Sequence, residues 1–215
     1  MLRLRRPMSW LPGDTAGRFV FEIVTITAGI LIALWIDGIK EDRKDQALVR
    51  SAQEQLAREI ADNQRDVSGT GPSRDAHMKA LAEGLRAIEA LRNSQAPMPK
   101  LPSLGLSSPS FPRSAWETAA RTGALALMDY PHAKTYTELY DLQDLVDRAQ
   151  QRYLDRLAEQ STEFFLVTQR PPGFDSRGAN LETARAQALA LLGAFENYRT
   201  LMTQLAREYE TASKL

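Results

Sequence analysis

Few side chains in this sequence have the type and spacing that catalysis or metal binding requires. There is no cysteine, which removes disulfides, thiolate nucleophiles and thiolate metal ligands. The two histidines, His77 and His132, lie far apart and have no partner at the spacing of a helical zinc site. The sequence also lacks a glycine-rich phosphate loop, a Gly-x-Ser-x-Gly elbow, a His-Glu-x-x-His motif and a dinucleotide fingerprint. We therefore expect no catalytic residue, no metal site and no cofactor, and a protein that is not an enzyme.

Carboxylates are numerous, but on polar helix faces they are usually solvated or paired with cations. The clearest groups are Glu41 with Asp42, and Asp141 with Asp144 and Asp147. An envelope enzyme that uses a cluster of buried carboxylates in a cleft stays open as an alternative. Lys+Arg and Asp+Glu both number 27, so no net charge favours binding to nucleic acid, and we expect no nucleic-acid partner.

The most distinctive local group of side chains contains Trp116 and Arg121. In a ligand or partner pocket, Arg121 would clamp an anion and Trp116 would form an aromatic wall, with Tyr140 as a third residue. In the structural interpretation, Trp116 fills a helix-bundle core and Tyr140 packs half-buried with its hydroxyl in water. We favour the structural interpretation, because helix capping and chain turning already explain the neighbouring residues.

The element that must position the rest is an apolar segment from Phe19 to Ile36. Its 18 residues contain one ionisable side chain, Glu22, and as a helix they would reach about 27 Å, close to the hydrocarbon thickness of a bilayer. Trp35 and the charged residues at 37–45 mark one exit, and Arg18 marks the other. We predict a transmembrane helix rather than a buried core helix, which is rarely this apolar on every face.

A cleaved signal peptide is the other alternative for this segment. The apolar run is longer than a usual signal core and ends in ALWID (Ala33–Asp37), without a small-x-small cleavage pattern. We therefore expect a retained anchor, which in a bacterial cell would lie in the inner membrane.

The orientation of the anchor follows from the basic residues that flank it. Four Lys or Arg precede the span and four follow it: Arg3, Arg5, Arg6 and Arg18, then Lys40, Arg43, Lys44 and Arg50. The first four are opposed only by Asp14, and a short tail ahead of a first span usually stays in the cytoplasm. We predict a C-terminal domain outside the cytoplasm, in the periplasm if the cell is Gram-negative.

One face of the span carries a carboxyl group, a hydroxyl group and two small residues. These are Glu22, Thr25, Gly29 and Ala33, at spacings of three and four. Small residues at this spacing let a second helix approach closely, so the face could support a homo-oligomer or a membrane-protein partner. In the alternative, Glu22 is only tolerated near the interface, facing Arg18 one turn back.

Two blocks of the sequence resemble a known family. The segment FEIVTITAGILIALWID (Phe21–Asp37) is similar to the anchor of a family of uncharacterised bacterial single-span membrane proteins with a domain of unknown function. SAWETAARTGALALMD (Ser114–Asp129), followed by Leu139–Asp141, is similar to a second block of that family. Family members usually have Gly where this chain has Phe21, and an Asn-rich exit from the span. The resemblance covers roughly a fifth of the chain and implies membrane anchoring and a helical extramembrane domain, but no reaction.

The sequence thus predicts an all-α protein: a tail at 1–17, an anchor at 18–37 and a helical extramembrane domain at 38–215, with an irregular Pro/Ser-rich loop at 93–112. The anchor should continue unbroken into 41–66, where Leu48, Ala52, Leu56 and Ile60 form a stripe. The turn cluster at 68–73 should stop this helix, and Ser73 should cap the next. That helix carries Met78, Leu81, Leu85, Ile88 and Leu91 on one face.

Three further helices complete the expected domain. Ser114 and Glu117 have the spacing of a capping box that opens a short helix, which Gly123 should end. A long helix should run from about Pro131 to Arg170, with a stripe of Tyr136, Leu139, Tyr140, Val146, Tyr153, Leu157 and Phe164. The last helix has the most regular stripe: Leu181, Ala184, Ala188, Leu191, Phe195, Tyr198, Met202, Leu205 and Tyr209. Together these stripes predict an antiparallel bundle or coiled coil, without a sheet.

The leading hypothesis for function is a non-enzymatic interaction or scaffold module of the cell envelope, in contact with the lipid bilayer. A second hypothesis is an extracytoplasmic ligand-sensing helical bundle that signals through a membrane partner. Both hypotheses rest on the predicted membrane anchor and on the apolar helix faces, in a sequence that shows no catalytic motif.

Overall fold

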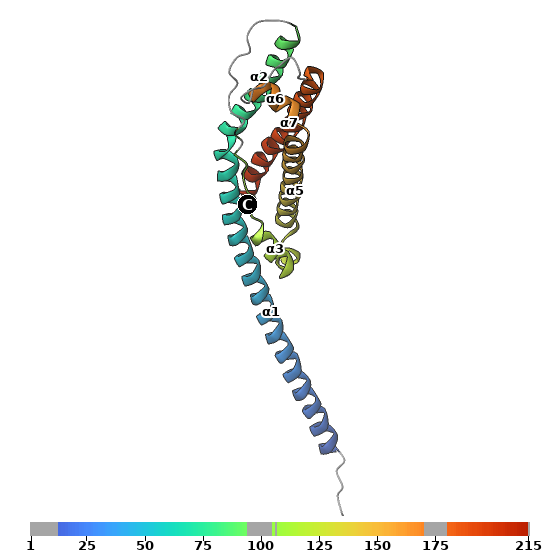
Figure 1. Cartoon of the computed structure of the whole chain (residues 1–215). Helices are drawn as coiled ribbons and strands as arrows, with labels where there is room; N and C mark the ends of the chain where they lie inside the picture. Colours follow the sequence, from blue (N-terminus) through green and yellow to red (C-terminus); the bar gives the residue numbers. More distant parts are fainter. Residues whose placement is uncertain (1–12, 94–104, 106, 170–179, 215) are drawn as a thin grey trace, which may run out of the picture. The chain divides into compact units, whose positions relative to one another are not determined.

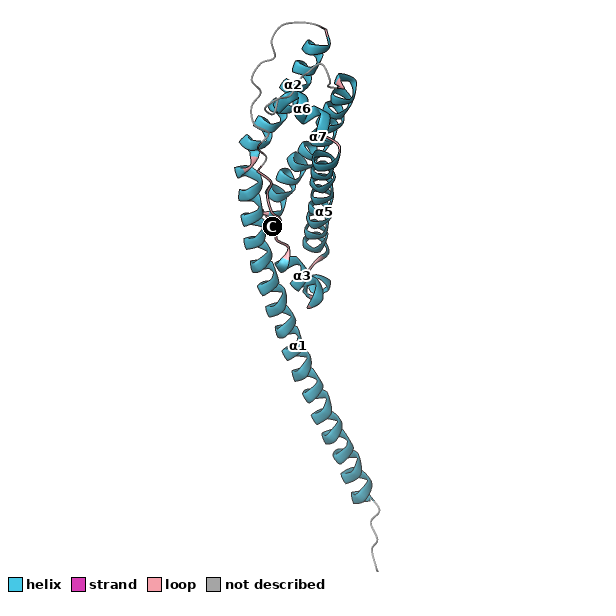
Figure 2. Ribbon diagram, in the orientation of Figure 1, coloured by secondary structure: helices cyan, strands magenta, loops and turns pink. Residues whose placement is uncertain are grey.

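The computed structural model describes residues 13–93, 105, 107–169 and 180–214, and they form an all-α protein without strands (Figures 1 and 2). The helices are α1 Gly13–Gly69, α2 Gly71–Arg92, α3 Ser114–Arg121, α4 Ala124–Leu127, α5 Tyr130–Glu159, α6 Thr162–Gln169 and α7 Leu181–Ala212. The chain divides into two compact units, residues 1–48 and 49–215. The all-α prediction is confirmed. Of the loop expected at 93–112, residues 94–104 and 106 lie outside the described residues, and residues 107–112 are not helical.

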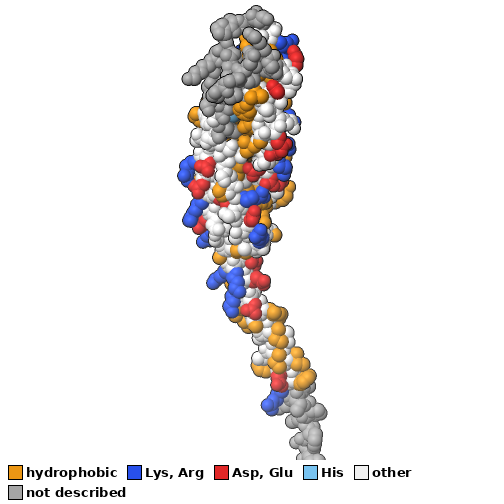
Figure 3. Space-filling view, viewed as in Figure 1, with side chains coloured by type: hydrophobic (Ala, Val, Ile, Leu, Met, Phe, Trp, Pro, Cys, Tyr) orange, Lys and Arg blue, Asp and Glu red, His pale blue; other side chains and the backbone are white. Residues whose placement is uncertain are grey.

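The first unit consists, in its described part, of the N-terminal portion of α1. Every residue from Phe19 to Ile36 is exposed, and this is the one helix in the described chain that is long and apolar enough to cross a membrane. Figure 3 shows its mostly hydrophobic surface. Thr25 and Thr27 donate hydrogen bonds to carbonyl oxygens four residues back, each over 2.8 Å. Their hydroxyl groups therefore need no water, as a lipid-facing helix requires.

The C-terminal part of α1, from Val49 to Gly69, belongs to the second unit and buries an apolar stripe. Ala52, Leu56, Ile60 and Val67 are each 9% exposed or less. The helix passes through Gly38 without interruption, as predicted, because no proline breaks its backbone hydrogen bonds.

The junction between α1 and α2 differs from the prediction. α1 extends to Gly69 and α2 begins at Gly71, with Thr70 between them and Pro72 in the first turn. Ser73 lies inside α2 and does not cap it; its hydroxyl oxygen accepts a hydrogen bond from the backbone N–H of Ser107, 3.0 Å away. Ser73 thus helps to hold the loop that returns towards α3.

The core of the second unit lies between α2, α5 and α7. Gln143 contacts Tyr209 and Gln150 contacts Tyr198, so α7 runs antiparallel to α5. The ion pair between Arg92 and Glu182 (3.2 Å) and the contact of His77 with Phe195 show that α7 is also antiparallel to α2. The predicted antiparallel bundle is confirmed, and of the nine stripe residues of the last helix all except Leu181 are buried.

The buried face of α2 is rotated from the predicted stripe. Leu81 and Ile88 are buried as expected, whereas Met78, Leu85 and Leu91 are only half-buried. The buried face instead includes small or polar residues: His77, Ala80, Gly84 and Ala87. These let α6 and α7 pack close to the α2 backbone.

The long helix expected from Pro131 to Arg170 is two helices, so this prediction is wrong. α5 begins with Pro131 in its first turn and ends at Glu159, and α6 begins at Thr162. The hydroxyl of Ser161 donates to the carbonyl of Leu157, and the backbone N–H of Phe164 donates to Gln187 Oε1 of α7 over 3.0 Å. Because α7 supplies an acceptor for an N–H at the start of α6, the tertiary fold stabilises a break that apolar periodicity does not reveal.

Candidate functional site

The most concentrated polar cluster in the second unit surrounds Glu59 of α1. Its side chain is 9% exposed and accepts hydrogen bonds from two backbone N–H groups, those of Ala115 (2.8 Å) and Trp116 (3.4 Å). It also accepts from the Ser114 hydroxyl (3.0 Å) and the Tyr140 hydroxyl (2.6 Å). Burial of a carboxylate is tolerated only with such compensation. With four donors bound, this carboxylate acts as a structural acceptor rather than as a free base.

Glu59 caps the N-terminus of α3 from another helix. The first N–H groups of a helix lack partners within it, and a negative charge there is favourable. The capping box expected from Ser114 and Glu117 does not form: Ser114 donates to Glu59, and Glu117 pairs with Arg113 (3.7 Å) and Arg121 (3.2 Å). Gly123 does end α3 as predicted, with a φ of 80°.

Two of the three predicted pocket residues lie together. Trp116 is half-buried and stacks on Tyr140, with ring centroids 4.9 Å apart and an angle of 11° between the planes. Arg121 is not part of this contact, because its side chain is 80% exposed and pairs with Glu117 on its own helix. Trp116 and Tyr140 thus cover one side of the Glu59 cluster, while Arg121 faces solvent.

Four of the five buried tyrosines form polar links across the core rather than exposing their hydroxyl groups to water. Besides Tyr140, the hydroxyl of Tyr198 donates to Gln150 Oε1 (3.1 Å), Tyr209 bonds to the amide of Gln143, and Tyr153 bonds to His77 Nε2. Burial raises the pKa of Tyr198 and Tyr209 to about 12. Burial also raises the pKa of Tyr153, and burial with the Glu59 hydrogen bond raises that of Tyr140. All four hydroxyl groups are therefore neutral donors or acceptors at ordinary pH.

His77 lies between α2, α5 and α7. Its ring is 1% exposed, stacks at a tilt on Phe195 (4.7 Å between centroids) and meets Tyr153 edge-on. Burial lowers the pKa of His77. It is a neutral core residue, and no group of His, Asp and Glu side chains that could hold a metal ion occurs in the described part of the chain.

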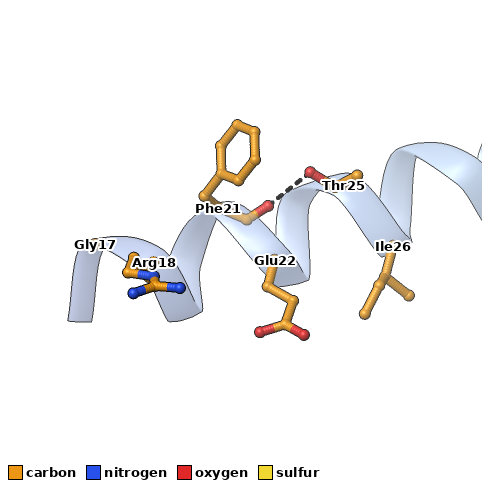
Figure 4. A pocket seen from close by; sticks show the side chains of 6 residues that line it. All are labelled: Gly17, Arg18, Phe21, Glu22, Thr25 and Ile26. Carbon is orange, nitrogen blue, oxygen red and sulfur yellow. Dashed lines mark hydrogen bonds between the residues drawn. The ribbon is translucent and has the colours of Figure 1, made fainter. Parts of the chain in front are cut away.

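The predicted packing face of the span is exposed on α1. Glu22 and Thr25 line an open depression together with Gly17, Arg18, Phe21 and Ile26. In Figure 4, Glu22 points to the same side of α1 as Arg18 and Ile26, whereas Thr25 lies beside Phe21 on the other side. Gly29 has no atom of another element within 4 Å of the position a Cβ would take. Arg18 and Glu22 line the same depression but form no ion pair within 4.0 Å in the described structure. This face stays a prediction.

No family model, curated protein or solved structure matches the chain.

Sequence reasoning did not predict the buried polar residues, which include Glu59, Asn63, His77 and Gln143. Glu59 and Asn63 flank Ile60 on the buried face of α1, and Asn63 donates to the carbonyl oxygen of Pro112 over 2.9 Å. The available signal was their position: each lies beside or within an apolar stripe, where a polar side chain needs a partner. Which partner it finds is not visible in the sequence.

Proposed function

We propose that the chain is a membrane-anchored helical interaction module of the bacterial cell envelope. The supporting observation is α1: one uninterrupted helix carries an uncovered apolar segment and, further along, a stripe buried in the second unit. The apolar segment is suited to hydrocarbon, and the described helices of the second unit offer exposed surfaces on which a partner could pack. In this proposal the anchor lies in the inner membrane, and residues 38–215 lie in the periplasm.

Membrane attachment is tested by fractionation of cells that produce the full-length chain. We expect the protein to stay in the membrane pellet after an alkaline carbonate wash and to be released by detergent. Ile30→Arg places a charge in the middle of the span, where insertion costs about 2.5–3.5 kcal/mol, and should move protein out of the pellet. Thr203→Arg, on the exposed surface of α7, is the matched control. Recovery of the unaltered chain in the supernatant without detergent would contradict the proposal.

Orientation is tested with single cysteines, which the cysteine-free sequence allows. Thr203→Cys should react with a membrane-impermeant maleimide in spheroplasts, whereas Ser9→Cys should react only after the cells are lysed. The reverse pattern would place the second unit in the cytoplasm.

The partner is sought by crosslinking in the native membrane, followed by detergent purification. If Gly29 and Ala33 face a second copy, Gly29→Cys should form a disulfide-linked dimer, because Gly29 lies on the small-residue face. Leu31→Cys, two residues on and on the opposite side of the helix, should not. Equal crosslinking at both positions would indicate random collision, and a specific heterologous protein at Gly29 would identify a membrane partner.

A further inference from the structure

We propose that residues Ser114–Leu127, the α3–α4 arm, are a detachable lid that Glu59 holds against the core of the second unit. Neutralising this one carboxylate opens the arm while the bundle of α2, α5 and α7 stays folded. The inference concerns the second unit alone and does not depend on membrane attachment.

The polar attachments of the arm are concentrated in its first three residues. Ser114, Ala115 and Trp116 all donate to the Glu59 carboxylate. From Glu117 onwards, every hydrogen bond and ion pair of the arm in the described structure stays within residues 113–128. They comprise hydrogen bonds donated by the side chains of Thr118, Arg121 and Thr122, and backbone hydrogen bonds in the turns. Glu117 adds ion pairs with Arg113 and Arg121. The carboxylate of Glu59 therefore supplies the direct polar contacts of the arm with the core, and the only other polar link in the described structure is indirect, from Glu117 through Arg113 to Asp144.

The arm buries little apolar surface against the rest of the second unit. Within the arm, only Ala119 and Ala124 are fully buried, whereas Ala115, Leu125 and the Trp116 ring that stacks on Tyr140 are half-buried. Leu127 is 46% exposed. Apart from Tyr140, which the arm helps to cover, helices α5, α6 and α7 bury five aromatic rings completely: Tyr153, Phe164, Phe195, Tyr198 and Tyr209. Because stabilisation scales with buried apolar area, the arm is held far more weakly than the helices beneath it.

Non-helical backbone bounds the arm on both sides. Residues 107–113 precede it, and Met128 and Asp129 are extended between α4 and α5. The preceding segment has its own tethers, from Asn63 to the Pro112 carbonyl and from Arg113 to Asp144. These tethers are not bonds of the arm, so the arm can open about Pro112 and Arg113 and uncover the ring of Tyr140.

Native-state hydrogen exchange on the full-length protein in detergent tests the lid. Glu59→Gln keeps the size of the side chain but removes its charge. In this variant the backbone N–H groups of residues 117–121 should exchange at least about tenfold faster, because the loss of one hydrogen bond to a charged group changes an equilibrium constant by about that factor. Amides around Val146 and Tyr198 should keep their rates. Glu54→Gln, an exposed carboxylate on the same helix, is the control.

Trp116 fluorescence provides a second readout. With Trp10 and Trp35 replaced by Phe, Trp116 is the sole tryptophan, and Glu59→Gln should shift its emission to the red and increase quenching by iodide. Unchanged emission and exchange in Glu59→Gln would overturn the proposal, and so would equal loss of protection in the arm and the bundle.

If Glu59→Gln does not fold, hydrogen exchange on the unaltered protein still tests the proposal. In low denaturant its arm amides should exchange through an opening with a smaller denaturant dependence than the bundle amides. A single common opening would show that the arm is integral to the core and would overturn the lid.

Discussion

Gly84 lets the ring of Phe164 in α6 pack directly against the backbone of α2. A Cβ at this position would lie 2.8 Å from Cε2 and 2.9 Å from Cζ of Phe164 in α6, too close for a methyl group. Phe164 is itself 1% exposed, so its ring has little room to move. Glycine is therefore required here by packing, despite its low helix propensity.

Gly84→Ala should destabilise the second unit by about 1–3 kcal/mol, the usual cost of overpacking a core. Gly193 is a matched control: it is also helical, but a Cβ there would meet nothing within 4 Å. Gly193→Ala should stabilise α7 by about 0.5–1 kcal/mol through helix propensity. Urea unfolding followed by circular dichroism measures both. A neutral or stabilising Gly84→Ala would show that α6 does not pack there.

The buried His77 should make the stability of the second unit sensitive to acid. Its folded-state pKa is lowered by burial, so the unfolded chain binds a proton more readily than the folded chain does. The stability is fully present above the unfolded value of about 6.5 and decreases as pH falls from there through the lower folded pKa. In His77→Gln, the loss of unfolding free energy over this range should be smaller than in the unaltered protein. Parallel curves of unfolding free energy against pH for His77→Gln and the unaltered protein would refute the assignment.

At the scale of elements, the start of α7 depends on one side chain. Asn180 is the N-cap residue, and its side-chain oxygen accepts a hydrogen bond from the backbone N–H of Thr183 over 2.9 Å. This is the capping geometry that satisfies an otherwise unpaired N–H at a helix end. α7 packs against α2, α5 and α6, so its first turn matters to the whole bundle.

Asn180→Ala should cost about 1 kcal/mol of unfolding free energy. Asn197→Ala, at an exposed interior position of the same helix, should cost nothing or stabilise slightly, because alanine is the better helix former. Thermal unfolding of the two variants separates loss of the cap from loss of an asparagine. Equal effects would mean that the Asn180 hydrogen bond contributes nothing.

At the scale of the second unit, four buried tyrosines join its helices and should limit its stability in alkali. The pKa of Tyr198 and Tyr209 is raised to about 12, and that of Tyr140 and Tyr153 is also raised, so the folded state disfavours tyrosinate. Their contribution is fully present below the unfolded pKa of about 10 and decreases as pH rises through that value towards the folded ones.

Tyrosinate absorbance and helical circular dichroism should therefore change together above about pH 10. Tyr209→Phe should make the alkaline loss of stability less steep than in the unaltered protein, because it removes one hydroxyl group whose ionisation the folded state disfavours. Titration of all tyrosines near pH 10 with the helices intact would contradict this prediction.

Local patterns predicted most of the architecture. The helices, the uninterrupted α1, the stripe of α7 and the turn at Gly123 follow from apolar periodicity and glycine placement, which report what each residue's near neighbours along the chain allow. The predicted Trp116 and Tyr140 do meet, although Arg121 does not join them.

Only the folded chain shows which distant groups meet. Glu59 and Tyr140 are 81 residues apart, and His77 and Tyr153 are 76 apart, so no spacing rule pairs them. The break before α6 depends likewise on an acceptor from α7, and the cap of α3 comes from α1. Periodicity identifies the face of a helix that is buried, whereas the partner of a buried polar group depends on the register of two helices, which arises from packing across the whole core.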